Sequence, residues 1–378
     1  MKKLVIITYA DFPNGEAASV RIFSLCKMLL SKEFDISIIS MSRQAPFYWN
    51  GYEGIKYISI RSPKTSIIAR ICNVVFFRRR ASKVIRAIGD INYLMPLSLP
   101  ITAMLYCERY AKKHKISLIT DRTEWYSPCE FKLGRLSYEY LNNLLINRVI
   151  IDRYWKVISI SRFFEKYFLS KGIDTIRIPA VMVRSDISVS QTFNYEQSRP
   201  LIVVYAGSPA KKDSLDKIVD AFHVYRGKEI ELHVYGVTLE HFKKVNKRDD
   251  EYNNVSFHGR IPREKILSVL ANSDFTVLFR DPTKRFTKAG FPSKVAESMM
   301  CGVPVITNLT SDLDLFLIDM KNAVVIPDYT VDSLVDVLQK VASLKKDQIK
   351  AMHDEAYNTA INSFDYSVYE EKFQSFFR

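Results

Sequence analysis

Residues 275–308 hold the pattern that most restricts the fold of this chain. Two short apolar runs, 275–279 and 303–307, have the length and β-rich composition of buried strands. Between them, a loop that ends at Pro292 leads into a run with helical spacing of apolar residues. The apolar face of that run consists of Val295, Ala296, Met299 and Met300.

A short helix is therefore expected between the two strands. Ser293 suits its N-cap and Gly302 its C-cap. A strand, loop, helix, strand unit of this kind packs as a right-handed parallel crossover. Glu297 lies on the first turns of the helix, near backbone amides that favour anions. A nucleotide could place its phosphates on those amides while the Glu297 carboxylate accepts hydrogen bonds from paired ribose hydroxyls.

The same stretch resembles the donor-binding signature of the retaining glycosyltransferases of family 4, which have the GT-B fold. That family carries Glu, seven residues, Glu, and then a small residue before Cys-Gly-x-Pro-Val-Ile. Glu297 matches the second acid and residues 301–306 match the tail, whereas Ala289 stands in place of the first acid. The Phe-Pro-Ser-Lys run at 291–294 is similar to a variant in bacterial surface-polysaccharide transferases. The resemblance implies donor contacts from Phe291, Pro292, Ser293, Lys294 and Glu297.

The composition fits a globular protein with more than one domain. The 378 residues are enough for two domains of ordinary size, each with its own core. The 47% hydrophobic and 25% charged residues are typical of soluble proteins. No apolar run approaches the roughly 18 residues of a membrane span, and the run after Lys3 stops at Tyr9, which favours a first strand over a signal peptide. The five cysteines have no paired spacing, which favours reduced cytosolic thiols.

Positive charge is concentrated in the first half of the chain. Residues 1–200 hold 31 Lys and Arg against 16 Asp and Glu, a net of +15. Residues 201–378 hold 24 against 25, a net of −1, and the two sum to +14. This asymmetry suggests that the first domain faces a polyanion or an anionic membrane.

Residues 67–86 interleave basic and large apolar side chains. The pattern suits anionic headgroups and acyl chains, and a solvated helix face is the alternative. No recognition motif or stacking platform accompanies it, so no nucleic-acid partner is expected. The basic positions are Arg70, Arg78, Arg79, Arg80, Lys83 and Arg86.

The first domain opens with a strand at 3–8, a turn-rich loop, a helix at 19–30 and a strand at 34–40. This order is typical of α/β domains that handle nucleotides or phosphates. Because Gly15 is alone in the loop, a dinucleotide site of the Gly-x-Gly-x-x-Gly type is not expected. The family resemblance implies that Gly15 approaches the donor diphosphate and the acceptor. An ordinary β-to-α turn is the alternative.

Polar and aromatic residues follow the strand expected at 116–120. They lie where open α/β sheets bind ligands, and the segment resembles one found at this point in the Phe-Pro-Ser-Lys relatives. Asp121 and Glu124 are therefore candidates to contact the transferred sugar or the acceptor hydroxyls. A salt bridge within this loop, with Arg122, is the alternative.

A second α/β domain opens with the strand at 201–205. The loop after it enters a helix with a lysine at its mouth, which is a phosphate-binding arrangement. In the resembled family this loop reads Gly-Arg, a few residues, then Lys-Gly. Lys212 matches the lysine, and Ser208 stands in place of the arginine. One ligand of the donor diphosphate is thus missing from its usual position.

Two other cations are candidates for the missing charge. Arg280 ends the strand before the signature, and Lys294 lies in the first turn of the signature helix. A lysine is unfavourable at the positive end of a helix, so a nearby anion is the natural explanation for Lys294. Arg260 and Ile261 follow the glycine of a loop that resembles the family's base-binding loop. The resemblance implies that their backbone reads the edge of the nucleobase.

These patterns predict an α/β protein with the GT-B fold, in which two Rossmann-like domains with parallel sheets face a central cleft. Residues 1–183 are expected to bind the acceptor. A linker at 184–200 would join them to a nucleotide-sugar domain at 201–362. A C-terminal helix at 363–378 would cross back to the first domain.

The resemblance implies transfer of a sugar from a nucleoside-diphosphate sugar, with UDP favoured, and with retention of the anomeric configuration. The acceptor would be a saccharide, in particular a lipid-linked one, in the synthesis of capsule or O-antigen polysaccharide. Because the leaving group is a diphosphate, its stabilisation should be the largest catalytic contribution, and Lys212 and Arg280 are assigned to it. No metal or other cofactor is expected, because no clustered His, Asp and Glu set of metal-ligand type is evident.

Two alternatives remain open. A non-hydrolysing sugar-nucleotide 2-epimerase shares the fold, but it needs acid and base groups, and the six histidines form no evident cluster. A partner-binding protein on a degenerate transferase scaffold is suggested by Ala289 and Ser208. The charge asymmetry further predicts a cytoplasmic protein that lies peripherally at the inner face of the cell membrane.

Overall fold

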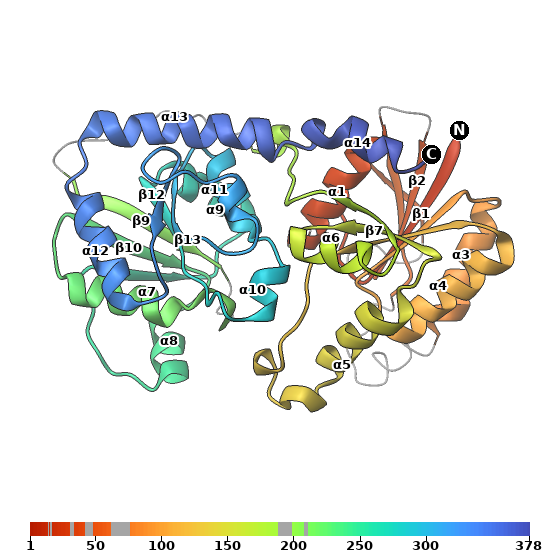
Figure 1. Ribbon diagram of the computed structural model, residues 1–378, viewed down its shortest axis with the longest axis horizontal. Coiled ribbons are helices and arrows are strands. Elements are labelled where there is room, and N and C mark those ends of the chain that lie inside the picture. Colours follow the sequence, from red (N-terminus) through yellow and green to blue (C-terminus); the bar gives the residue numbers. More distant parts are fainter. Residues whose placement is uncertain are drawn as a thin grey trace. The chain divides into compact units, whose positions relative to one another are not determined.

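The computed structural model divides into two compact units (Figure 1). One is Met1–Val181 together with Tyr366–Arg378, and the other is Met182–Asp365. The structure describes residues 1–13, 15, 17–30, 34–41, 48–61, 76–187, 199–207 and 211–378. Of the sequence predictions, Ser208, residues 67–75 and most of the linker at 184–200 lie outside the described residues.

The first unit is built on an eight-stranded sheet with the order β3-β4-β2-β1-β5-β6-β7-β8. Every neighbouring pair is parallel except β3 and β4. The inner strands are continuous apolar runs, as a sheet covered by helices on both faces requires. The strands are β1 (Lys2–Thr8), β2 (Phe34–Ser40), β3 (Asn50–Tyr52), β4 (Ile55–Ser59), β5 (Tyr93–Leu97), β6 (Ser117–Arg122), β7 (Trp155–Ser159) and β8 (Asp174–Arg177).

Helices cover this sheet on both faces (Figure 1). Ser137 caps one of them, because its side chain accepts a hydrogen bond from the Tyr140 amide at 3.3 Å. The helices are α1 (Ala17–Leu30), α3 (Phe77–Ile88), α4 (Ile101–His114), α5 (Tyr138–Leu145), α6 (Arg162–Leu169) and α14 (Glu370–Ser375). Shorter turns are η1 (Pro128–Glu130), η2 (Gly134–Leu136), the π-helical η3 (Ile146–Ile150) and η7 (Tyr366–Tyr369).

The end of the chain packs into the first unit. Phe377 is fully buried, and its ring lies 5.1 Å from that of Tyr93 and 5.6 Å from that of Phe34. Gln374 donates a hydrogen bond to the Met28 carbonyl at 2.8 Å. The apolar positions of the C-terminal helix are thus explained by its return to this unit.

The second unit has a six-stranded sheet, all parallel, with the order β11-β10-β9-β12-β13-β14. Its strands are β9 (Leu201–Ala206), β10 (Ile230–Tyr235), β11 (Val255–Gly259), β12 (Phe275–Leu278), β13 (Val305–Asn308) and β14 (Ala323–Ile326). Its helices are α7 (Leu215–Tyr225), α8 (Leu239–Asn246), α9 (Arg263–Ala271), α10 (Arg285–Ala289), α11 (Ser293–Met300), α12 (Val331–Ala342) and α13 (Lys346–Ser363). Short turns are η4 (Arg184–Asp186), η5 (Lys211–Asp213) and η6 (Leu313–Leu315).

The crossover predicted at 275–308 is present as β12, α11 and β13, with α10 as an additional short helix in the loop. Gly302 has a φ of +75°, the left-handed conformation that glycine adopts just beyond a helix end. The predicted N-cap is wrong. Ser293 is the first helical residue, and Pro292 before it makes no side-chain capping bond. Proline's fixed backbone angle, rather than a hydroxyl, sets the start of α11.

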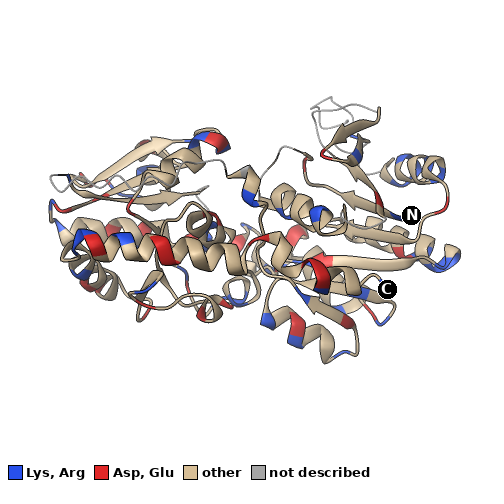
Figure 2. Ribbon diagram, turned by 90° about the horizontal axis from the view of Figure 1, so that it is seen from above, with Lys and Arg blue, Asp and Glu red and all other residues tan. Residues whose placement is uncertain are grey.

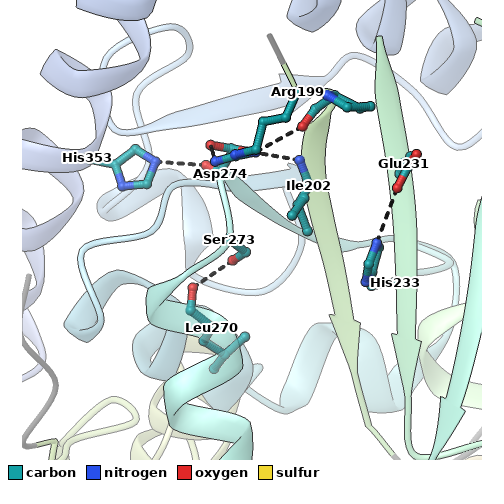
Figure 3. Close-up of polar contacts among 9 residues, drawn as sticks. Arg199, Ile202, Glu231, His233, Leu270, Ser273, Asp274 and His353 are labelled. Carbon is teal, nitrogen blue, oxygen red and sulfur yellow. Dashed lines mark hydrogen bonds and ion pairs between the residues drawn. The ribbon is translucent and has the colours of Figure 1, made fainter. Parts of the chain in front are cut away.

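A buried network ties α13 to the amino-terminal edge of the second sheet (Figure 3). Asp274, which precedes β12, accepts hydrogen bonds from Arg199 at 2.6 and 2.9 Å and from the Ile202 amide at 2.7 Å. The ring of His353 on α13 donates to the Asp274 carbonyl at 2.8 Å. Burial holds the pKa of His353 below its usual value, which keeps the imidazole neutral.

Both sheets have a point at which the strand order reverses. In the second unit the chain builds β9, β10 and β11 in one direction and then places β12 on the other side of β9. In the first unit the reversal lies between β1 and β5. Ligands of open α/β sheets bind at the carboxyl ends of the strands at such a point.

Candidate active site

A cluster of charged side chains lies at the carboxyl edge of the second sheet, where β9 and β12 meet. Arg280 follows β12, Lys294 lies in the first turn of α11, and Asp213 lies between β9 and α7. Three elements that are distant in sequence thus deliver their side chains to the predicted ligand edge of the sheet.

The Asp213 carboxylate lies between two cations. Its Oδ2 forms an ion pair with the Lys294 ammonium, and its Oδ1 lies 3.5 Å from Arg280 Nε. The Tyr205 hydroxyl donates to Oδ2 at 3.3 Å and accepts from Lys294 Nζ at 3.4 Å. Arg280 and Asp213 are buried, whereas the Lys294 side chain keeps 32% of its surface exposed. The lysine is therefore the most accessible member of the cluster.

The charges of the cluster are stable at neutral pH. Burial alone would raise the pKa of Asp213, but Lys294 and Arg280 outweigh it and hold the pKa below its usual value. For Lys294, burial acts to lower the pKa, and Tyr205 and Asp213 together raise it instead. Burial raises the pKa of Tyr205 to about 12. Two cations and one carboxylate leave a net positive charge, which suits an anion.

Gly207, directly after β9, makes room for the lysine. A Cβ at this position would lie 2.0 Å from Lys294 Nζ and 3.2 Å from the Tyr205 hydroxyl. The absence of a side chain lets the ammonium rest against the backbone of the strand end. Sequence reasoning missed Gly207, Tyr205 and Asp213. The signal was present, because all three flank the loop that already contained Lys212.

Glu297 lies one turn further along α11 and has a partner. Its Oε1 is 2.5 Å from Nη1 of Arg263, the first residue of α9. Glu297 and Lys294 line the same small cavity of about 20 Å³, together with Ala206 and Thr276. The structure thus brings together the two charged side chains of the signature helix. Arg263 is a further residue that sequence reasoning missed.

Lys212, the other cation assigned to the diphosphate, lies outside the Asp213 cluster. Lys212 is half-buried, and its Nζ lies 5.9 Å from the ring centroid of Phe286 on α10. Arg260 is exposed and Ile261 half-buried, in the short connection between β11 and α9 that leads to Arg263.

The aromatic part of the signature belongs to the core. Phe291 is buried, and its ring lies 5.7 Å from the rings of both Phe316 and Phe364. Pro292 is also buried and Ser293 is half-buried. The Phe291 side chain thus packs in the core, so the donor contact that the resemblance implied for this residue would come from its backbone. Ala289, in place of the family's first acid, is fully buried on α10.

In the first unit, Asp121 has a structural partner. It lies at the end of β6, where its two oxygens accept from Arg21 on α1 at 2.6 and 2.8 Å. Arg21 also donates to the carbonyls of Pro179 and Ile178. The salt bridge considered between Asp121 and Arg122 is wrong. Arg122 points elsewhere and donates to Asn147 at 2.8 Å, and burial lowers its pKa to about 10.

Glu124 and Gly15 lie at the same edge. The Glu124 side chain is exposed, and Asn143 on α5 fixes its backbone by donating to its carbonyl at 3.0 Å. A Cβ on Gly15 would lie 2.1 Å from Ser19 Oγ and 2.9 Å from the Asp11 carbonyl oxygen. Gly15 is thus required by the tight approach of α1 to the strand end, which is the role of an ordinary β-to-α turn.

Among the described residues, no group of three or more His, Cys, Asp and Glu side chains could hold a metal ion. The sequence does contain Asp312-Leu313-Asp314, an Asp-x-Asp pattern of the kind that can bind metals. Its two acids diverge, because Asp312 is buried and Asp314 is exposed. None of the described helices combines the length and the apolar composition that a membrane span needs.

Comparison with known proteins gives a family match for the second unit and a fold match for the whole chain. Residues 190–359 match the model of the glycosyl transferases group 1. Among curated protein sequences, no significant match to this chain was found. Solved structures match over nearly the whole chain. The sucrose-phosphate synthase of Thermosynechococcus elongatus has a TM-score of 0.78 at 15% identity and covers 100% of this chain and 98% of its own.

Two further solved structures match the chain over a similar length. HepE of Anabaena, in complex with UDP and glucose, has a TM-score of 0.71 at 13% identity, with 99% of both chains covered. WaaG, a glycosyltransferase involved in lipopolysaccharide biosynthesis, has a TM-score of 0.69 at 13% identity, again with 99% of both chains covered. At these identities the likeness establishes the GT-B fold. The second unit thus matches the glycosyl transferases group 1, and the chain as a whole has the GT-B fold that the sequence predicted.

Proposed function

We propose that the Asp213, Lys294 and Arg280 cluster binds the diphosphate of a UDP-sugar and that Glu297 binds its ribose. The observation that carries this assignment is the convergence of two cations at the strand-order reversal of the domain that matches the family. Structural neighbours support the choice of nucleotide. HepE of Anabaena was solved with UDP-glucose, and the trehalose-6-phosphate protein of E. coli with UDP-2-fluoro glucose.

The proposed reaction is transfer of the sugar with retention, as the family match on the second unit suggests. The bond between the anomeric carbon and the diphosphate oxygen breaks, and an acceptor hydroxyl oxygen bonds to the same carbon on the same face. The acceptor proton passes to the departing phosphate, so no side chain needs to act as the base. Arg280 and Lys294 stabilise the charge that develops on the leaving group, in a partly desolvated site where such stabilisation is most effective. Lys212 adds to the positive field of the same loop. No metal is required in this scheme.

Glu297 and Arg263 form a pair that a donor can open. Arg263 is 38% exposed, so its guanidinium can turn toward solvent when ribose hydroxyls replace it on the carboxylate. The backbone of Arg260 and Ile261, in the loop before Arg263, then lies next to the nucleobase.

For the acceptor, we propose a lipid-linked saccharide at an anionic membrane surface, in polysaccharide synthesis. The segment after β6 exposes a series of large apolar side chains that a saccharide alone would not require. Tyr138, Leu141, Leu145 and Val149 are spaced to lie along one face of α5 and η3. The exposed fractions are 71% for Leu133, 79% for Leu136, 61% for Tyr138, 41% for Leu141, 42% for Leu145 and 64% for Val149. The positive charge of the first unit, marked in Figure 2, adds attraction to anionic headgroups.

A donor screen on the full chain tests the first part of this proposal. UDP-sugars should raise the thermal midpoint, because ligands that bind only the native state stabilise it. Product analysis then separates transfer from epimerisation, since an epimerase would convert the donor without an acceptor. Stabilisation by GDP-sugars and not by UDP-sugars would overturn the choice of nucleotide, and no response to any nucleotide sugar would overturn the site.

A further inference from the structure

A groove on the first unit lies between α3 and α4, and none of its lining residues belongs to the proposed donor site. Its volume is about 1140 Å³. Side chains of both helices line it, and the sequence singled out only those of α3. The lining residues include Arg78, Arg79, Arg86, Arg109, Lys113 and His114, with Phe77, Tyr106 and Tyr110 between them.

The way the two helices pack produces this lining. α3 buries Phe77, Ala81 and Ile85, at a spacing of four residues, so Arg78, Ser82 and Arg86 face outward. α4 buries Ala103, Cys107 and Ala111, which turns Tyr106, Arg109 and Tyr110 toward the groove. Each helix thus uses its apolar face for the core and its basic face for the groove.

The charge in the groove is of one sign. Five Arg and Lys side chains line it, and no Asp or Glu does. Within the part of the chain that the structure describes, none of the five forms an ion pair. Asp90, past the end of α3, acts electrostatically on Tyr110 but does not line the groove. The five cations therefore raise a positive potential that an anionic ligand would neutralise.

Contacts between the aromatic residues and their neighbours give the groove fixed walls. The Tyr106 hydroxyl is hydrogen-bonded to Ser82 Oγ at 2.5 Å, and the Arg78 guanidinium lies over the Tyr106 ring at 5.7 Å. The Tyr110 and His114 rings stack at 4.4 Å. A solvated helix face would not need these contacts between its side chains, whereas a binding groove gains from preorganised walls.

We propose that this groove binds phosphate esters. Arginine side chains match phosphate geometry through paired N–H donors, and three of the five cations are arginines on one helix. Phosphate binding in this groove would add to the proposed function, and it does not require that the transfer reaction is assigned correctly. Phe77 at one end of the groove contacts the ring of Tyr9 at 5.8 Å, just past β1 at the strand-order reversal. A phosphate-bearing ligand held in the groove thus lies beside the edge where the acceptor is expected.

The phosphate could belong to a lipid headgroup or to a soluble ester, and two probes distinguish them. One is vesicles of phosphatidylglycerol, compared with vesicles of phosphatidylcholine. The other is glycerol phosphate, measured by calorimetry. The groove variant is Arg109→Gln with Lys113→Gln, both on α4 and outside the donor site. The matched control is Lys112→Gln with Lys166→Gln, which removes the same charge from exposed positions that do not line the groove.

We expect the groove variant to bind its probe about 30-fold more weakly at low salt, since each basic residue contributes roughly 1 kcal/mol. The affinity of the control variant for the same probe should fall only a few-fold. Saturable binding of glycerol phosphate that the variant lacks identifies a soluble ester, and loss confined to phosphatidylglycerol vesicles identifies a lipid headgroup. Equal losses in variant and control, or no binding to either probe, would overturn the proposal. UDP-sugar affinity should be unchanged in both variants, so failure here is distinct from failure of the donor site.

Discussion

Two buried aspartates lie at opposite ends of the strands of the second sheet, and they have different kinds of partners. Asp274, at the amino edge, is 2% exposed and bonds a guanidinium, a backbone amide and, through its own carbonyl, a histidine. Asp213, at the carboxyl edge, is 7% exposed and contacts side-chain termini from three other elements. Burial and ion pairing alone therefore do not separate a structural carboxylate from one in a binding site.

The two aspartates differ in whether their partners can leave them for a ligand. The Ile202 amide is fixed in β9 and cannot leave Asp274 without breaking the strand. Lys294 ends in a flexible, partly exposed chain, so it can move from Asp213 to an arriving phosphate at small cost. The first arrangement stabilises a unit, and the second, under the proposed function, holds two cations ready for an anion.

The largest effect should come from breaking the amino-edge network. We expect Asp274→Ala to lower the free energy of unfolding by about 3–5 kcal/mol, because it removes a buried carboxylate that accepts from both Arg199 and the Ile202 amide. Urea titration gives the measurement. Glu355→Ala is the control, since its pair with Lys321 is half-exposed and should contribute less than about 1 kcal/mol. Loss of donor affinity in folded Asp274→Ala protein would contradict a purely structural role for Asp274.

At the carboxyl ends of the strands, Arg280→Ala should lower turnover in protein that still folds. Removing a preorganised cation from a developing charge costs roughly 10²–10³ in kcat. The backbone at this position should stay in place, because Asn308 bonds both its amide and its carbonyl, at 3.0 and 2.8 Å. Lys288→Ala, an exposed cation on α10, is the control. Wild-type activity should persist after chelation, and strict dependence on Mg²⁺ or Mn²⁺ would contradict this assignment.

A smaller effect is expected for Glu297→Gln. A charged hydrogen bond contributes roughly 1.5–3 kcal/mol, so donor affinity should fall by about tenfold to a hundredfold. Arg263→Ala sharpens the result, because it removes the same ion pair but leaves the carboxylate. If Glu297 binds ribose, Arg263→Ala should keep or improve donor affinity. Equal losses in the two variants would make the pair structural, like that of Asp274.

The smallest effect is a difference in pH dependence between the stability that the Asp274 network supplies and the donor affinity of the Asp213 cluster. His353 has its pKa held below its usual 6.5 by burial, so its contribution to stability is present above 6.5 and is lost as pH falls below it. Asp213 titrates below 3.8 and Lys294 above 10.5, so the cluster keeps its charges between these limits. From pH 8 to 5.5, unfolding free energy should fall, and less so in His353→Gln, while UDP-sugar affinity should stay level.

Sequence reasoning reached the fold because the parallel crossover and the signature are local patterns. It found Glu297 and Lys294 for the same reason: both lie on one short helix. It could not pair Lys294 with Asp213, or Glu297 with Arg263, because these partners are separated by 81 and 34 residues and meet only through sheet order. It misplaced the Asp121 contact likewise, since Arg21 is 100 residues away. The groove cations of α4 were missed because the sequence does not show which helix faces α3.

The central claim is that the Asp213 cluster binds a diphosphate, and calorimetry with UDP and uridine tests it most directly. Wild-type protein should bind UDP far more tightly than uridine, because only UDP carries the charge that Lys294 and Arg280 attract. In Lys294→Ala, uridine affinity should be unchanged, and the advantage of UDP should shrink by about tenfold to a hundredfold. An advantage of UDP that survives intact in Lys294→Ala would contradict the claim and place the diphosphate elsewhere.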